Sequence, residues 1–293
     1  MGERSQLLNL AYRMLGSLAE AEDAVQEAYA RWYAMPAERQ EQIASPGAWL
    51  STTTSRICLD LLGSARMRRE RYVGEWLPEP VPDRAGDPAE RITLDESIST
   101  AFLVMLESMT PPQRVAFILH DVYRYSFDEV ADIVGRTPAA CRQLASSARR
   151  RVREAPAPVA PARQAEVVRD FRVAWTAQDI ESLIGLLDPD AVAIADGGGR
   201  AVAFRDPVEG GANVARLLVW LVGQVPAGLV IAESTVNGRP GLIARLDGVT
   251  TTVYAFQLTG DRISRLWIVR NPEKLRLWSE DPLGPPEHEP AES

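Results

Sequence analysis

One stretch near the middle of the chain, residues 137 to 153, holds five arginines and no acidic residue. Arginine and glutamine side chains carry hydrogen-bond donors and acceptors that match base edges in the major groove of DNA. Further arginines bind phosphates, which position a protein on the duplex without reading its sequence. We expect base contacts from Arg142, Gln143 and Ser146 and phosphate contacts from Arg149 and Arg150. The stretch therefore favours DNA recognition over bond-making chemistry.

A helix-turn-helix is predicted around this stretch. Ser126 to Gly135 reads as a short helix closed by glycine, and Thr137-Pro138 begins a second helix after a turn of a few residues. The apolar residues of the second helix share one face, which leaves its polar residues outward. These apolar residues are Cys141, Leu144, Ala148 and Val152. A solvated basic helix would show the same pattern, because bare helix-turn-helix matches are common.

Two helices are predicted at the start of the chain. The first follows the apolar residues from Leu7 to Leu15 and stops at Gly16, and Ser17 has the form of a cap for the second. The second helix has an apolar stripe and an opposite polar face. That polar face carries Asp23, Gln26 and Glu27. Such a face either is solvated or contacts another protein.

A third helix is predicted from Pro46 to Tyr72, after a polar loop at residues 34 to 45. Its C-terminal part is basic, which suits the helix dipole and offers charge to phosphates. Candidate DNA contacts on this helix are Arg56, Arg66 and Arg68. Trp49 is open to two interpretations, a core residue or a base-stacking residue, and the core is favoured.

The pattern changes in the last third of the chain. A proline-alanine stretch is typical of a stiff tether, and alternating apolar residues after it predict strands at 250–258 and 263–269 behind two helices. We expect a multidomain protein with two all-α domains and a C-terminal α+β domain. The predicted units are a helical domain at 1–72, a linker at 73–92, a helix-turn-helix domain at 93–154, a tether at 155–163, the α+β domain at 164–279 and a disordered tail at 280–293.

Composition narrows the function classes. The formal net charge of −8 argues by itself against a nucleic-acid partner, but the arginines are gathered in one segment and the early acids in another. Cys58 and Cys141 stand alone, so neither a disulfide nor a metal site is predicted. No apolar run is long enough to span a membrane and the first residues lack the pattern of a signal peptide, so we expect a cytoplasmic protein.

Several motifs resemble one known family. Tyr12–Ser17 and Ala21–Tyr29 are similar to region 2 of ECF sigma factors, and residues 109 to 153 are similar to region 4. Trp76-Leu77-Pro78-Glu79-Pro80 and the segments 196–200 and 271–275 resemble signature stretches of the SigJ-type subgroup, which has a SnoaL-like (NTF2-like) C-terminal domain. The resemblance covers nearly the whole chain.

The resemblance implies partners and roles. RNA polymerase core would bind through its β′ clamp helices to the face with Asp23, Gln26 and Glu27, and its β flap would be a further contact. The helix with Arg56, Arg66 and Arg68 would melt and read the −10 promoter element. The second helix of the helix-turn-helix would read the −35 element.

The resemblance also implies that the C-terminal domain packs on region 2 and on the linker, with Trp76 as an anchor, and regulates the protein in cis without a separate anti-sigma factor. Lys274 and Arg200 are expected to pair with linker acids such as Glu79. The expected interdomain contacts are Trp76, Leu77, Pro78, Asp196, Gly197, Gly198, Arg200, Asn271 and Lys274.

Two other functions stay open from sequence. One is a transcriptional regulator that senses a small ligand through the C-terminal domain. The other is an enzyme with appended DNA-binding domains, although the only histidine after the tether is His288 in the predicted tail. Asp196 could serve as an acid or base, but Asp-Gly-Gly-Gly first predicts a turn. We therefore expect no enzyme activity, no cofactor and no metal.

Overall fold

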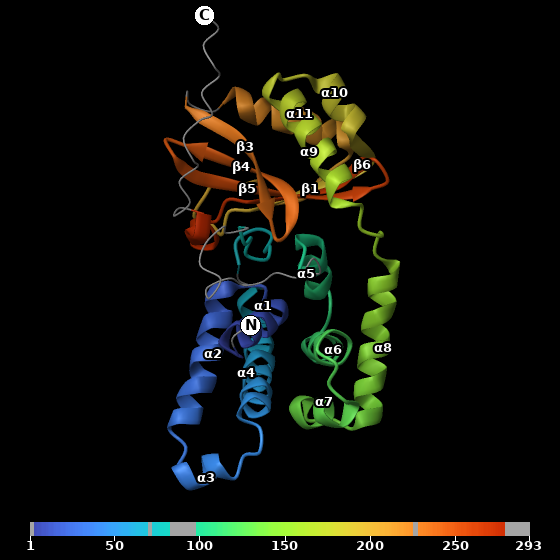
Figure 1. Ribbon diagram of the computed structural model, residues 1–293. Coiled ribbons are helices and arrows are strands. Elements are labelled where there is room, and N and C mark those ends of the chain that lie inside the picture. The colour runs from blue at the N-terminus through green and yellow to red at the C-terminus, as the bar shows by residue number, and fades with distance from the viewer. Residues whose placement is uncertain (1–2, 70–71, 83–97, 225–227, 279–293) are drawn as a thin grey trace, which may run out of the picture.

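A computed structural model of the chain describes residues 3–69, 72–82, 98–224 and 228–278 (Figure 1). The predicted tail at 280–293 and linker residues 83–92 lie outside the described residues. The first helices are α1 (Glu3–Leu15), α2 (Leu18–Tyr33), α3 (Ala37–Glu41) and α4 (Pro46–Arg69). Gly16 adopts a left-handed φ of +69° that ends α1, and the Ser17 side chain accepts a hydrogen bond from the Glu20 amide and caps α2. The segment 34–45, predicted as a loop, contains the short helix α3.

The second helical part contains α5 (Thr100–Glu107), α6 (Pro111–Phe117), a π-helical turn η1 (Ile118–Val122), α7 (Phe127–Val134) and α8 (Pro138–Glu154). The predicted helix-turn-helix is α7 and α8. Ser126 and Glu129 form a capping box at the start of α7, and Gly135 ends it with a φ of +69°. Thr137 then caps α8 at the Ala140 amide. Local sequence therefore accounts for both ends of the turn.

One apolar core joins the two helical parts. Tyr12 and Met14 of α1 belong to the same buried cluster as Leu106, Ile118 and Leu119. Within the α1 to α8 portion that the structure describes, the two predicted helical domains therefore pack against each other through a shared core. Large apolar side chains from both parts are buried in a shared interface, and the hydrophobic effect stabilises that interface.

Arg114 is a buried charged residue whose polar contacts connect helices within this shared core. Its guanidinium donates to the backbone carbonyl of Met14 at 2.8 Å and forms an ion pair with Glu107 at 2.7 Å. Burial lowers the pKa of Arg114 to about 10. A buried charge without a partner destabilises the folded state, so the two acceptors offset the cost of burying the Arg114 guanidinium.

The C-terminal part begins with α9 (Pro161–Thr176) and α10 (Ile180–Leu186) and continues as a six-stranded sheet. Its strands are β1 (Leu187–Asp196), β2 (Val208–Glu209), β3 (Leu229–Val236), β4 (Arg239–Leu246), β5 (Val249–Thr259) and β6 (Arg262–Val269), with α11 (Gly211–Gly223) between β2 and β3. The strand order is β2-β1-β6-β5-β4-β3, and β1 runs parallel to β6 while the other pairs are antiparallel. The predicted α+β architecture is confirmed.

Both faces of the sheet are covered. Alternate residues of β5 point to opposite sides, so that Tyr254 and Phe256 join the core under α9, α10 and α11, while Val253 and Ala255 join a second cluster with Leu77 of the linker. Two short 3-10 turns, η2 (Pro272–Lys274) and η3 (Arg276–Trp278), follow the sheet on this second side. Figure 1 shows α5 directly beneath the sheet and the three helices on its far side. The sheet is thus the layer that connects the C-terminal domain to the linker.

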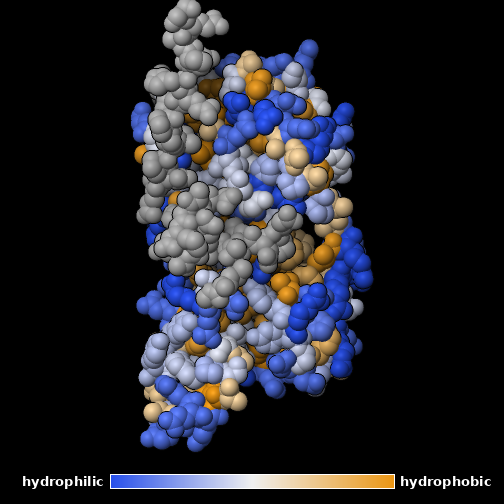
Figure 2. Space-filling model, in the orientation of Figure 1, coloured by the Kyte–Doolittle hydropathy of each residue, from blue (hydrophilic) through white to orange (hydrophobic). Residues whose placement is uncertain are grey.

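The outer surface is mainly polar. On the face shown in Figure 2, hydrophilic residues dominate the helical part and apolar residues form smaller patches. Among the described residues, no helix has the length and apolarity needed to cross a membrane.

Candidate functional site

The linker lies between the sheet and the helical part, and every residue from Leu77 to Pro82 is buried. Leu77 is 2% exposed and packs against Trp267 and Val253 of the sheet. Pro82 forms an isolated antiparallel bridge with Val236 at the end of β3. The linker therefore contacts the C-terminal domain along its described length.

Asp196, the last residue of β1, binds this linker. Its side chain is fully buried and accepts hydrogen bonds from the Leu77 amide at 2.9 Å and the Tyr72 hydroxyl at 2.7 Å. The Lys274 ammonium completes the cluster at 2.7 Å from Asp196 Oδ2, and it also donates to the Leu77 carbonyl at 2.5 Å. Asn271 donates to the Tyr72 hydroxyl at 2.8 Å. Burial raises the pKa of Tyr72, so its hydroxyl stays protonated and donates to the carboxylate.

The glycines after Asp196 make room for this cluster. Gly198 has a φ of +60°, and a Cβ there would lie 2.3 Å from the side-chain amide of Asn271. Gly197 is equally tight, since a Cβ would lie 2.3 Å from the Ala201 carbonyl oxygen. The Asp-Gly-Gly-Gly segment is therefore a turn, as the sequence predicts, and the structure shows that it packs against Asn271.

Arg200 and Lys274 form ion pairs with acids other than the linker acids that the sequence analysis expected. Arg200 pairs with Glu273 at 2.8 Å, and Lys274 pairs with Asp196. Each of these pairs lies within the C-terminal domain, because the turn after β1 and η2 are neighbours there.

The anchor of the linker is Leu77 rather than Trp76. Trp76 is half-buried, and the centre of its ring lies 4.0 Å from the Lys274 ammonium in a cation–π contact. The far edge of the ring also packs over Gly16, where a Cβ would lie 3.0 Å away. Pro78, the third predicted linker contact, is buried.

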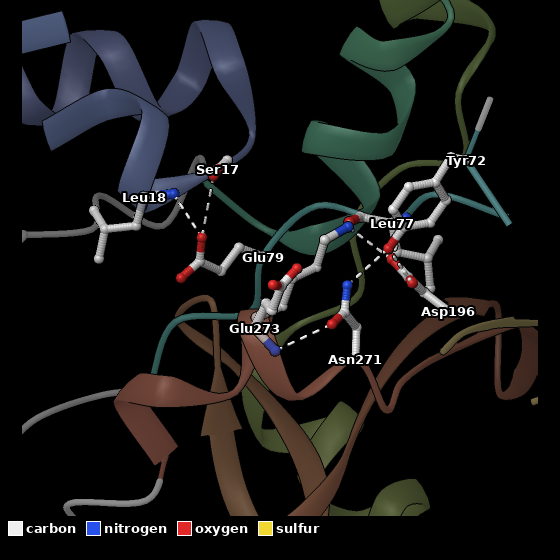
Figure 3. A network of polar contacts seen from close by, with 9 residues as sticks. Ser17, Leu18, Tyr72, Leu77, Glu79, Asp196, Asn271 and Glu273 are labelled. Carbon is white, nitrogen blue, oxygen red and sulfur yellow. Dashed lines mark hydrogen bonds and ion pairs between the residues drawn. The ribbon is translucent and has the colours of Figure 1, made fainter. Parts of the chain in front are cut away.

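Glu79 fixes the linker to the start of α2, which the sequence did not indicate. Its carboxylate accepts from the Leu18 amide at 2.8 Å and from the Ser17 hydroxyl at 3.3 Å (Figure 3). Its backbone amide donates to the Gly16 carbonyl at 2.8 Å. A carboxylate at this position satisfies free amides at a helix N-terminus and complements the helix dipole. Burial raises the pKa of Glu79, while these hydrogen bonds and the charge of Lys274 oppose that rise.

Asn237 is a second contact that the sequence analysis missed. It lies at the tip of the β3–β4 hairpin with a φ of +50° and is 1% exposed. Its side chain contacts α1, the linker and the start of α5. The Asn237-Gly238 dipeptide is a signal for a tight hairpin turn. No local signal places that turn against the helices.

The predicted polymerase-binding residues lie together on the exposed face of α2. Asp23, Gln26 and Glu27 are all exposed, and Glu27 pairs with Arg31 one turn further along at 2.8 Å. The structure therefore leaves this face accessible.

The predicted DNA contacts on α4 are engaged differently. Arg56 is exposed, and its Nη2 atom donates to the backbone carbonyl of Asp132 in α7 at 3.0 Å. Arg66 and Arg68 lie on α4, but their side chains are outside the described residues. Trp49 is partly buried against Trp32, with ring centres 5.3 Å apart.

The exposed face of α8 carries four of the eight predicted contacts to DNA. Arg142, Gln143, Ser146 and Arg150 are exposed, and Arg142 lies over the Phe127 ring of α7. Arg149 is different, because it forms an ion pair with Asp121 of η1 at 2.6 Å. It is half-exposed and ties α8 to the preceding turn.

The interior of the C-terminal domain is filled by aromatic side chains. Phe171 and Trp175 of α9 pack edge-on against Phe256 and Tyr254 of the sheet. Burial raises the pKa of Tyr254 to about 12. Asp196, the one acid considered for catalysis, is bonded to the linker instead. In the described ranges no group of three or more metal-ligating side chains is found.

Comparison with known proteins provides independent evidence of the family to which this chain is related. Residues 2–68 match the family described as Sigma-70 region 2, and residues 99–152 match the family described as Sigma-70, region 4. The ECF RNA polymerase sigma factor SigJ of Mycobacterium tuberculosis is 40% identical over 287 residues, which cover 93% of this chain and 90% of that relative. A probable ECF RNA polymerase sigma factor, SigI of the same organism, is 33% identical over 284 residues, with 96% and 93% covered.

A crystal structure of SigJ extends the comparison to three dimensions. It matches this chain with a TM-score of 0.77 at 36% identity, covering 93% of this chain and 95% of that one. The similarity therefore spans both helical parts and the α+β part in a single relative.

Proposed function

This chain belongs to the ECF family of RNA polymerase sigma factors, and we propose that its three parts divide the work of a promoter-directing factor that controls itself in cis. It is a transcription initiation factor and not an enzyme, and its partners are RNA polymerase core and promoter DNA. The observation that carries the division of work is that the predicted polymerase and DNA contacts lie on the helices α2, α4 and α8, while the predicted interdomain contacts lie in the linker and the C-terminal domain.

Polymerase binding belongs to α2 in this proposal. The exposed face with Asp23, Gln26 and Glu27 offers acidic and amide side chains to the β′ clamp helices. The β flap would hold the second helical part.

Promoter reading belongs to α4 and α8. Arg142, Gln143 and Ser146 present side chains that pair with base edges of the −35 element, while Arg150 contacts phosphates. Arg56, with Arg66 and Arg68 further along α4, serves the −10 element.

The two reading helices are too close together for simultaneous use. At about 3.4 Å per base pair, the roughly 25 base pairs between the two elements span about 85 Å. By contrast, α4 with its 24 residues is about 36 Å long at 1.5 Å per residue, and it contacts α7 through Arg56. This geometry supports a closed form that must open before both elements are bound.

The C-terminal domain is the natural regulator of that opening. It holds the buried linker through Leu77 and Asp196. A linker that is bound to the sheet is not free to extend between separated helical parts. We therefore assign to this domain the role that a separate anti-sigma factor has in other systems.

Runoff transcription with purified RNA polymerase core tests the function. The full chain is compared on a genomic promoter library with a chain that ends after Glu154. Specific transcripts from either version support the sigma-factor function, and a higher yield from the shorter chain supports inhibition in cis. Stable binding of the full chain to duplex DNA without polymerase, and no transcripts from either version, would favour a ligand-sensing regulator instead.

A further inference from the structure

One side chain connects the C-terminal domain to all three other segments of the chain. Asn237 Nδ2 donates to the Tyr12 hydroxyl of α1 at 2.7 Å, and its Oδ1 accepts from the Val81 amide of the linker and from the Thr100 hydroxyl of α5, each at 3.3 Å. Its backbone amide donates to the Val81 carbonyl at 2.9 Å. These partners lie 225, 156 and 137 residues away in the sequence.

The neighbours of this side chain extend the connection. The Tyr12 hydroxyl donates in turn to the Glu79 carbonyl at 2.6 Å, and Glu79 caps α2. Thr100 is the first residue of α5, whose Ala101 and Val104 pack against the sheet. The hydrogen bonds of one buried residue therefore reach α1, the linker at Val81 and the first residue of α5. Through Tyr12 and Glu79 they also connect to the start of α2.

The position also explains why asparagine suits the tip. A φ of +50° is unfavourable for most side chains but tolerated by asparagine, whose amide offers both a donor and an acceptor. Asp196, by comparison, contacts the linker and its own domain, and none of its described hydrogen bonds reaches α1 or α5.

We infer that Asn237 is the positioning residue that keeps the two helical parts and the C-terminal domain in the closed form. This inference rests on the proposed function, because only a sigma factor needs the parts to separate on a promoter. When the chain opens, the buried amide loses all three side-chain partners together, which makes its contribution specific to the closed form.

The test replaces Asn237 by glycine, which accepts the positive φ and removes the side-chain hydrogen bonds without backbone strain. Opening is measured as the rate at which an amine-reactive reagent labels Lys274 in the full chain. Peptide mapping distinguishes labelling of Lys274 from labelling of the N-terminal amine. Lys274 is the only lysine of the sequence and is buried beside Leu77 and Asp196. Since the loss of one buried hydrogen bond shifts an equilibrium by about 10-fold, we expect N237G to raise the labelling rate at least about 10-fold.

A matched control separates this role from general stability. Gln164 is another buried amide, and it donates to the Pro240 carbonyl inside the C-terminal domain. Q164A should lower the urea midpoint of the chain and leave Lys274 labelling slow under native conditions. Tyr12→Phe removes one partner of Asn237 and also the hydrogen bond to the Glu79 carbonyl. It should give an intermediate rate, and combining it with N237G should add less than the sum of the two single effects.

Labelling of N237G at the wild-type rate, or equally fast labelling of Q164A, would overturn the inference. This readout needs no polymerase, so it stands apart from the proposed function. If N237G labels faster and also gives more transcript at limiting polymerase, the closed form is the inhibited one. If it labels faster while no version of the chain yields transcripts, Asn237 keeps its role and the sigma-factor proposal fails.

Discussion

The Lys274 ammonium lies 2.7 Å from the Asp196 carboxylate, which is completely buried, and the pair holds the linker against the sheet. The two residues lie 78 residues apart in the sequence. Their surroundings exclude water on the carboxylate side, while the Trp76 ring covers the ammonium. Substitutions of this pair therefore measure how much it contributes to the binding of the linker by the domain.

Replacing Asp196 by alanine should be strongly destabilising. It leaves the Lys274 charge without its carboxylate partner in a buried site, and breaking one half of a buried pair costs about 3–5 kcal/mol. D196A combined with K274M should recover much of this loss, because no unpaired charge remains. Urea unfolding of the full chain measures both. A double variant as unstable as D196A alone would show that the pair is not the source of the effect.

The pH dependence of stability should carry the signature of Glu79. Burial raises its pKa in the folded chain, so the folded state keeps the proton at a pH where the unfolded state has lost it. The stabilisation is complete below the unfolded pKa and is lost as the pH rises through the folded pKa. E79Q should therefore flatten the decline of urea midpoints from acidic to neutral pH.

Glu129 is the matched control for this measurement. Its pKa is lowered by hydrogen bonds from Ser126 at the start of α7, so its contribution is complete above the unfolded pKa and is lost as the pH falls through the folded pKa. E129Q should change the pH profile in the opposite sense. The same sign for both variants would contradict the assignment to Glu79.

Arg142 and Arg149 should differ in what they do for promoter recognition. Arg142 is exposed on α8, and R142A should lose about 1–3 kcal/mol of discrimination at one base pair of the −35 element. Arg149 is paired with Asp121, and R149A should cost up to about 1 kcal/mol of stability without changing base preference. Runoff transcription on a set of −35 variants distinguishes these outcomes. A uniform loss of transcription across the −35 variants in R149A, beyond its loss of stability, would return that residue to the DNA-binding surface as a phosphate contact.

A covalent crosslink between α4 and α7 should block transcription initiation. The substitutions R56C and D132C would be joined by a short cleavable crosslinker. The crosslink would hold together the two positions that are now in contact through Arg56 and the Asp132 carbonyl. The native Cys58 and Cys141 are both fully buried, which limits side reactions. The crosslinked chain should give no transcript, and cleavage should restore the yield of the uncrosslinked double variant. Undiminished transcription in the tied form would rule out the need for opening.

The ends of the elements are local properties, and the sequence predicts them well. Gly16 and Ser17 separate α1 from α2, while Gly135 and Thr137 separate α7 from α8. Glycine permits a left-handed backbone and a hydroxyl satisfies free amides, and both effects act within one turn. Two strands of the C-terminal sheet, β5 and β6, were predicted from the alternation of apolar residues, which is also a local pattern. The short helix α3 was missed, since a polar segment lacks an apolar stripe.

The sequence by itself determined the helix-turn-helix, the exposed faces of α2 and α8 and the order of the parts. Only the tertiary structure decided the partners of Glu79, Asn237, Arg56 and Arg149, which come from segments distant in the sequence. Helix signals act over three or four residues, whereas these pairs depend on how whole helices and the sheet pack. That packing is set by the burial of many apolar side chains together, so no single motif contains it.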